Sequence, residues 1–266
     1  MTSSARPSAF LEALNIQAGV IGALILRELH TRFGRENIGY LWLFPEPMLL
    51  AVAVALLHNG HQLPIAGGIR PIPFAIAGYT LFIMFRSVVS RAETVLEANR
   101  PLLHHRPVTL VDMLIARSVL EVVSTTVVLT LLLGGAWALN VADPPARIEA
   151  VMAAIALMFW FSLGLAMLVT TASHLSPIVG RLVHPLLYLS MPLSGAFFSV
   201  AWLPSGVRDL VVWIPLVPIF ELLKTGQFAG FSSPYISLLY VVGWCSALTL
   251  VGLYGLSYLR SRVELS

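Results

Sequence analysis

The stretch Arg27–Pro47 reads RELHTRFGRENIGYLWLFPEP, and it places a cluster of charged side chains directly before a long apolar run. Anionic lipid headgroups favour each nearby arginine by about 1 kcal/mol. The stretch therefore predicts a chain that anchors at a membrane surface and then enters the hydrocarbon core. Glu46 is the exception inside the apolar run, where it stands between Pro45 and Pro47.

The composition of the whole chain also indicates an integral membrane protein. Of its 266 residues, 58% are hydrophobic and only 11% are charged, and the mean hydropathy is +0.85. A soluble domain carries about 25% charged residues, so this chain has too little polar surface to face water and lipid is the expected solvent. The first twenty residues lack the compact apolar core of a signal peptide. Cys245 is the sole cysteine, which excludes an intrachain disulfide.

Apolar periodicity predicts an all-α fold with an N-terminal amphipathic interfacial helix and six transmembrane helices. In the interfacial helix, one face repeats every four residues (Ile21, Ile25, Leu29, Phe33), and the other faces carry Arg27, Glu28, His30, Thr31 and Arg32. The expected spans are Tyr40–Leu57, Ile72–Val89, Leu110–Leu139, Ile148–Thr171, Leu182–Phe198 and Pro234–Leu259.

The segment Trp202–Gln227, between the fifth and sixth spans, is apolar but is interrupted by Pro215 and Pro218. Each proline removes a helix hydrogen bond. Backbone at membrane depth must stay helical or be covered by protein. We therefore expect two short re-entrant gate helices on the outer face in place of a further span.

The distribution of basic residues predicts the orientation. With six spans and a cytoplasmic N-terminus, twelve arginines face the cytoplasm and four basic residues face outward, namely Arg70, Arg147, Arg208 and Lys224. This bias agrees with the positive-inside rule. It predicts a cytoplasmic or interfacial segment at 1–39, a transmembrane domain at 40–259 and a cytoplasmic tail at 260–266.

The chain lacks familiar motifs for catalysis. It has no HExxH or comparable metal-ligand spacing, and no GxxxxGK[ST] loop for ATP phosphates; its only lysine is Lys224, in LLKTGQ. An intramembrane hydrolase would need Ser194 beside His174 or His184, but no GxSxG is present. We expect a non-catalytic subunit without metal, cofactor or nucleic acid, so that ATP and Mg²⁺ would bind a separate ATPase.

Several ionisable residues are expected at membrane depth, and each has two interpretations. Glu46 either pairs near the interface with an arginine such as Arg35, or lines a polar cavity beside a kinked helix. Arg117 and Glu121 are four residues apart and are expected to pair within one helix. Arg86 either contacts an anionic group or extends to the membrane surface.

Two motifs resemble the polysaccharide-export permeases of the ABC-2 type. The stretch RELHTRFGRENIGYLWLFPEP is similar to their N-terminal signature, which combines an amphipathic helix, a TRFGR-like turn and a GYLW-E-P start of the first span. Residues 93–121, ETVLEANRPLLHHRPVTLVDMLIARSVLE, resemble their cytoplasmic loop. The resemblance covers nearly the whole chain and is greatest for capsular polysaccharide (KpsM-type) exporters. An O-antigen or teichoic-acid exporter is the alternative, and a secondary transporter or intramembrane hydrolase represents a different class.

The resemblance implies a homodimer in the bacterial inner membrane, with two copies of a cytoplasmic ATPase and a channel for a lipid-linked, often acidic polysaccharide. A periplasmic co-polymerase and outer-membrane export proteins would be further partners. Arginines would meet an anionic linker and aromatic rings would stack on sugars. The hypothetical substrate pathway is Arg32, Arg35, Tyr40, Trp42, Glu46, Phe82, Phe85 and Arg86. The expected ATPase-coupling residues are Glu93, Glu97, Arg100, His104, His105 and Arg106, and the expected outer gate comprises Trp202, Asp209, Trp213 and Glu221.

Overall fold

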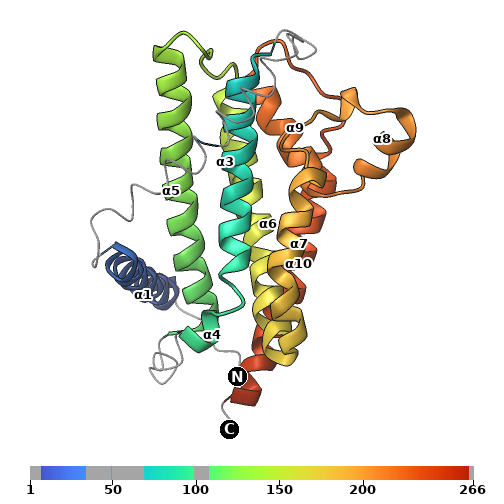
Figure 1. Ribbon diagram of the computed structural model, residues 1–266. Coiled ribbons are helices and arrows are strands. Elements are labelled where there is room, and N and C mark those ends of the chain that lie inside the picture. The colour runs from blue at the N-terminus through green and yellow to red at the C-terminus, as the bar shows by residue number, and fades with distance from the viewer. Residues whose placement is uncertain (1–6, 34–48, 50–68, 99–107, 264–266) are drawn as a thin grey trace.

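The computed structural model describes residues 7–33, 49, 69–98 and 108–263, and the long elements within these ranges are helices. Five of them run alongside one another in Figure 1: α3 (Pro71–Ser90), α5 (Leu110–Ala138), α6 (Ile148–Leu175), α7 (Pro177–Leu193) and α10 (Leu238–Val263). Helix α1 (Pro7–Phe33) crosses one end of α5 at a steep angle, and the short α4 (Val95–Ala98) lies at that same end. We call this end of the bundle the α4 end.

Four of the described helices are long and apolar enough to cross a bilayer: Pro71–Ser90, Leu110–Ala138, Ile148–Leu175 and Leu238–Ser261. Helix α7 has 17 residues, so it is about 26 Å long against the roughly 30 Å of a hydrocarbon core. These helices agree with the predicted integral membrane protein. Apart from Leu49, the first expected span, 40–57, lies outside the described residues, so the six-span topology stays a prediction.

Local sequence explains where the helices begin and end. Helix α3 starts at Pro71, a position that needs no amide donor. Helix α5 starts with a capping box, because the Thr109 hydroxyl accepts from the Asp112 amide at 3.2 Å and the Asp112 carboxylate accepts from the Thr109 amide at 2.9 Å. Helix α7 begins at Pro177 and is followed by Gly195 with φ +89°. It therefore lies five residues before the predicted Leu182–Phe198, and α10 lies four residues after the predicted Pro234–Leu259.

The segment 202–227 forms two short helices, as predicted, and Pro215 lies between them. Helix α8 (Ser205–Val211) stands to one side of the bundle, whereas α9 (Leu216–Gln227) packs between α3 and α6 (Figure 1). Pro215 is the residue before α9 and Pro218 lies in its first turn, where a proline removes no internal hydrogen bond. Every residue of α9 is buried, so this helix is part of the core and not a surface flap.

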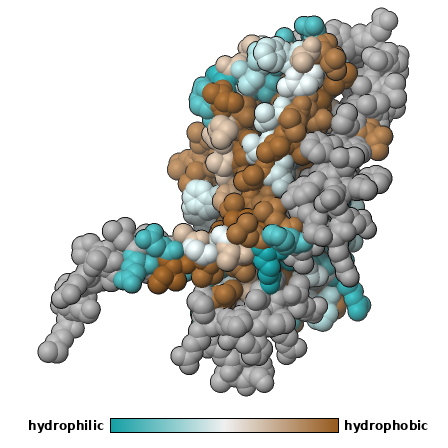
Figure 2. Space-filling model, turned by 90° about the vertical axis from the view of Figure 1, so that its left-hand side faces the viewer, coloured by the Kyte–Doolittle hydropathy of each residue, from teal (hydrophilic) through white to brown (hydrophobic). Residues whose placement is uncertain are grey.

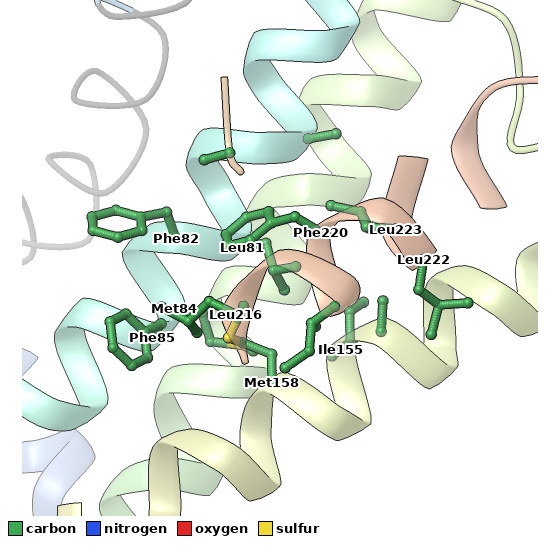
Figure 3. Close-up of a cluster of buried hydrophobic side chains, with 14 of the residues drawn as sticks. Leu81, Phe82, Met84, Phe85, Ile155, Met158, Leu216, Phe220, Leu222 and Leu223 are labelled. Atoms are coloured by element: carbon green, nitrogen blue, oxygen red, sulfur yellow. The ribbon is translucent and has the colours of Figure 1, made fainter. Parts of the chain in front are cut away.

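The main apolar core joins α3, α6 and α9. Figure 3 shows it, with Leu81, Phe82, Met84 and Phe85 from α3, Ile155 and Met158 from α6, and Leu216, Phe220, Leu222 and Leu223 from α9. A second contact, between α6 and α10, depends on small residues. A Cβ added at Gly252 would lie 2.6 Å from the Met167 Cβ, so glycine lets the two backbones approach closely.

The outer surface of the bundle is apolar over most of its length. Figure 2 shows hydrophobic residues along the middle of the α5 side and hydrophilic residues near one end and at the level of α1. Exposed aliphatic side chains include Val123, Val127 and Leu131 on α5 and Leu239 and Leu250 on α10. This arrangement suits a helix bundle surrounded by lipid, with α1 at the interface.

Candidate functional site

Buried ion pairs gather at the α4 end of the bundle. The predicted pair of Arg117 with Glu121 is wrong, because each residue finds a partner outside α5. The Arg117 Nε lies 3.2 Å from a Glu28 oxygen on α1, and the Glu121 carboxylate lies 3.3 Å from the Nε of Arg91, just beyond α3. Glu28 was expected on a polar outer face of α1 but is only 7% exposed, because that face packs against α5.

The turn between α3 and α4, which we call the corner (Arg91–Thr94), has contacts with several helices. The Arg117 guanidinium donates to the Arg91 carbonyl at 3.5 Å. The Thr170 hydroxyl of α6 donates to the Ala92 carbonyl at 2.9 Å. The His184 Nε2 of α7 lies 3.6 Å from a Glu93 oxygen. The corner is thus fixed to α5, α6 and α7 by side chains that the sequence interpretation did not single out for this purpose.

The structure places only part of the predicted substrate pathway. Arg32 lies in α1, but its side chain is not among those described, and Arg35, Tyr40, Trp42 and Glu46 lie outside the described residues. Phe82 and Phe85 are buried in the α3 core, so neither presents a ring face in this arrangement.

Arg86 is the predicted pathway arginine whose side chain the structure describes. It is partly exposed, and its guanidinium carbon lies 4.6 Å from the centre of the Tyr188 ring on α7. Tyr188 is 56% exposed. Sequence reasoning missed this tyrosine. A signal in the sequence could have identified Tyr188. Arg181, His184 and Tyr188 have helical spacing and form a polar stripe beside the aliphatic residues of α7.

The predicted coupling residues are also only partly described. Glu93 is half-buried at the corner, and Glu97 lies in α4 with its side chain outside the described set. The remaining four, Arg100, His104, His105 and Arg106, lie outside the described residues.

The predicted gate residues do not share one environment. Trp202 lies in a short 3-10 turn (Val200–Trp202), with its ring centre 5.3 Å from that of Phe74. Asp209 on α8 and Trp213 are exposed, and the Trp213 carbonyl accepts from the Tyr240 hydroxyl at 2.6 Å. Glu221, in contrast, is fully buried in α9.

Glu221 forms an ion pair with Lys224 one turn later, at an N–O distance of 3.1 Å. Glu221 also accepts from the Ser199 hydroxyl and the Val200 amide, each at 3.3 Å, and Lys224 donates to the Phe198 carbonyl. Burial lowers the pKa of Lys224 to about 8, although the Glu221 carboxylate acts in the opposite direction. The pair fastens the 198–200 turn to α9. Lys224, which the orientation analysis placed on the outer side, and Glu221, an expected gate residue, both lie inside the protein.

In the part of the chain that the structure describes, Ser194 does not pair with His184 and no metal-ligand cluster is present. The Ser194 hydroxyl donates to the Met191 carbonyl at 2.8 Å, and it is ten residues from His184, about 15 Å along α7. No group of three or more His, Cys, Asp or Glu side chains in these ranges could hold a metal ion. The α4 end offers ion pairs whose carboxylates are buried, and α3 and α7 offer the partly exposed contact of Arg86 with Tyr188.

Comparison with known proteins places this architecture among membrane transporters. The chain matches the family model of the ABC-2 type transporter over residues 19–228. It is 34% identical to the capsule polysaccharide export inner-membrane protein CtrC of Neisseria meningitidis serogroup B, over 97% of each chain. It is 31% identical to the capsule polysaccharide export inner-membrane protein BexB of Haemophilus influenzae, over 96% of each chain. The polysialic acid transport protein KpsM of Escherichia coli is 29% identical, over 94% of this chain and 95% of its own.

Proposed function

We propose that this chain, which belongs to the ABC-2 type transporter family, is the inner-membrane permease subunit of an exporter of capsular polysaccharide. The observation that carries the proposal is similarity over almost the full length to proteins named for capsule polysaccharide export. The apolar helix bundle supports it, because a permease must span the membrane.

Energy for transport is proposed to come from a separate ATPase with its own ATP and Mg²⁺. The full sequence has no phosphate-binding loop, and its only lysine, Lys224, is buried in an ion pair with Glu221. We place the contact with this ATPase in the segment 93–106, which begins in the corner and continues beyond it. Glu97, Arg100 and Arg106 would supply charges for that contact, and His104 and His105 lie between them.

The passage for the polymer is proposed to lie between two copies of the chain, each with six spans and with both ends in the cytoplasm. Helices α8 and α9 would form the outer gate. Because α9 is wholly buried against α3 and α6 and holds the 198–200 turn, gate movement would involve α8 and residues 201–204 more readily than α9. The exposed Asp209 and Trp213 are then the gate residues best placed to meet a periplasmic partner or the emerging polymer.

The substrate is proposed to be a lipid-linked polysaccharide with anionic groups. Arg86 and the exposed Tyr188 ring form a cationic and aromatic pair on α3 and α7, which suits a sugar ring that carries an acidic group. Arg32, Arg35, Tyr40, Trp42 and Glu46 remain candidates for the remainder of the pathway. Phe82 and Phe85 would contribute only if the elements around them moved apart, since both rings are buried in the core.

Deletion of the gene in its encapsulated host tests this function. We expect the strain to lose surface polysaccharide and to accumulate the polymer inside the cell, and the wild-type chain to restore the surface polymer. An Arg32→Ala, Arg86→Ala variant that inserts and dimerises normally should restore much less. Unchanged surface polysaccharide in the deletion strain would argue against the function itself, and full restoration by the double variant would argue against this pathway.

A further inference from the structure

We propose that Glu28, Arg117, Arg91 and Glu121 form a relay that transmits movement of the ATPase-coupling segment to the interfacial helix α1. The inference rests on the proposed function, since it requires a partner ATPase that moves the segment following the corner. It goes further by naming the residues that carry this movement into the membrane subunit.

The relay alternates negative and positive side chains from three elements. Glu28 on α1 lies 3.2 Å from the Arg117 Nε on α5, and an Nη of the same guanidinium donates to the Arg91 carbonyl at the corner. The Arg91 side chain then returns to α5, where its Nε lies 3.3 Å from Glu121. One guanidinium, that of Arg117, therefore joins α1 directly to the corner. Its planar fork of donors fixes the direction of both contacts.

The burial of the carboxylates makes the two ion pairs hard to break, whereas the 3.5 Å hydrogen bond from Arg117 to the Arg91 carbonyl is exposed. The Glu28 and Glu121 side chains are 9% and 5% exposed. A buried charge that loses its partner is strongly disfavoured, because water cannot replace the lost interaction. When the corner moves, the favourable response is for Arg117 and α1 to move with it while the pairs stay closed. The relay thus transfers a displacement that a loosely packed polar contact would absorb.

Helix α1 is anchored to α5 at two points, which lets it act as a lever. Besides the Glu28 contact, Gln17 donates to the carboxylate of Asp112, a buried residue that also caps α5. The two anchors are eleven residues apart, about 16 Å along α1. Displacement at Glu28 alone would tilt α1 about its second anchor. A tilt of a helix that lies in the membrane interface would change the access of a lipid-linked substrate beside it.

The corner also has fixed contacts on its opposite side. Thr170 of α6 donates to the Ala92 carbonyl, and Glu93 lies near His184 of α7. Movement of the coupling segment would therefore reach α6 and α7 as well as α1. His184 is one turn from Tyr188, the exposed ring beside Arg86. The corner thus connects the segment that contacts the ATPase with α1 and α7, the two helices proposed to face the substrate.

The test measures transport of lipid-linked polysaccharide per ATP hydrolysed, with the chain and its ATPase reconstituted together in lipid vesicles. Glu28→Gln and Glu121→Gln remove one charge each while they keep the side-chain shape. We expect both variants to retain the ATPase and its hydrolysis, and to lose about fivefold or more of the transport per ATP, the usual minimum for coupling between sites. Glu149→Gln is the matched control, because Glu149 is exposed in the first turn of α6, at the opposite end of the bundle.

A charge-exchange variant, Arg91→Glu with Glu121→Arg, distinguishes loss of the relay from loss of protein stability as the cause of reduced transport. It re-forms the ion pair in reverse and leaves the backbone carbonyl that receives Arg117, so the transport ratio should recover. If Glu121→Gln does not assemble, Arg91→Gln serves instead, since Arg91 is nearly half exposed.

A wild-type ratio in Glu28→Gln, or an unrecovered ratio in the charge exchange, would overturn the relay. A wild-type complex that shows no ATP-driven transport would instead overturn the proposed function, so the two failures are distinguishable.

Discussion

Removal of the carboxylate at Glu221 should destabilise the fold more than any substitution of an exposed charge. The variant Glu221→Leu leaves the Lys224 ammonium, 2% exposed, without its partner and removes the acceptor of the Ser199 hydroxyl and the Val200 amide. Loss of one member of a buried ion pair costs about 3–5 kcal/mol. For a domain of this size that corresponds to a fall of roughly 10 °C in melting temperature.

The double variant Glu221→Leu, Lys224→Met tests the origin of this loss. An apolar pair of similar volume often replaces a buried ion pair at little net cost, and methionine keeps a favourable contact with Phe74, whose ring centre is 5.2 Å from the Lys224 nitrogen. The double variant should therefore melt well above the Glu221→Leu variant, closer to the wild type.

The assay is thermal unfolding of the purified chain in detergent, with Glu149→Leu as the exposed control. Both single variants, Glu221→Leu and Lys224→Met, are measured beside the double variant. Strict additivity of the two single losses would contradict the reasoning, because independent contributions would mean that the pair is not coupled. A Glu221→Leu variant that melts within about 2 °C of the wild type, less than 1 kcal/mol, would contradict it equally.

Four further outcomes are expected. Gly252→Val should weaken the α6–α10 contact by about 1–3 kcal/mol through overpacking, whereas Gly243→Val, which meets nothing within 4 Å, should change the melting temperature little; equal effects would contradict the close approach. The pKa of Lys224 is lowered to about 8 in the folded protein, so between pH 8 and the ordinary lysine pKa the unfolded state binds more protons at this residue. The free energy of unfolding of the wild type, relative to that of Lys224→Met, should therefore rise from pH 7.5 to pH 9.5. A constant difference between the two proteins would refute this linkage. Thr109→Val removes half of the capping box of α5 and should cost about 1 kcal/mol in a melting experiment, and no loss would argue against the cap. Tyr188→Leu should reduce polymer export in cells while insertion stays normal, and full export would remove this ring from the pathway.

Much of the fold could be predicted because membrane helices follow length and hydropathy. The second, third and fourth predicted spans agree with α3, α5 and α6 to within a few residues at each end. Pro215 correctly indicated a break of the 202–227 segment into two helices, whereas Pro218 lies in the first turn of the second helix. The predicted fifth span lies five residues too late, because Pro177 starts α7 earlier than hydropathy alone suggests.

The ion pairs could not be predicted from spacing within one helix. Arg117 and Glu121 have the spacing of an intrahelical pair, but α1 and the corner approach α5 with charges of their own. A buried charged side chain pairs with the oppositely charged side chain that tertiary packing places beside it, and the two are often far apart in sequence. The same reason explains why Tyr188 and Ser199 were missed, and why the buried pair of Glu221 with Lys224 was not predicted.

Reconstitution of the purified chain in lipid vesicles, with and without its ATPase, tests the central claim most directly. The measured quantity is the ATP-dependent movement of lipid-linked capsular polysaccharide across the vesicle membrane. The proposed function predicts transport only when both subunits and ATP are present, and no ATP hydrolysis by the chain alone. Hydrolysis by the isolated chain, or no transport by the complete and active assembly, would contradict it.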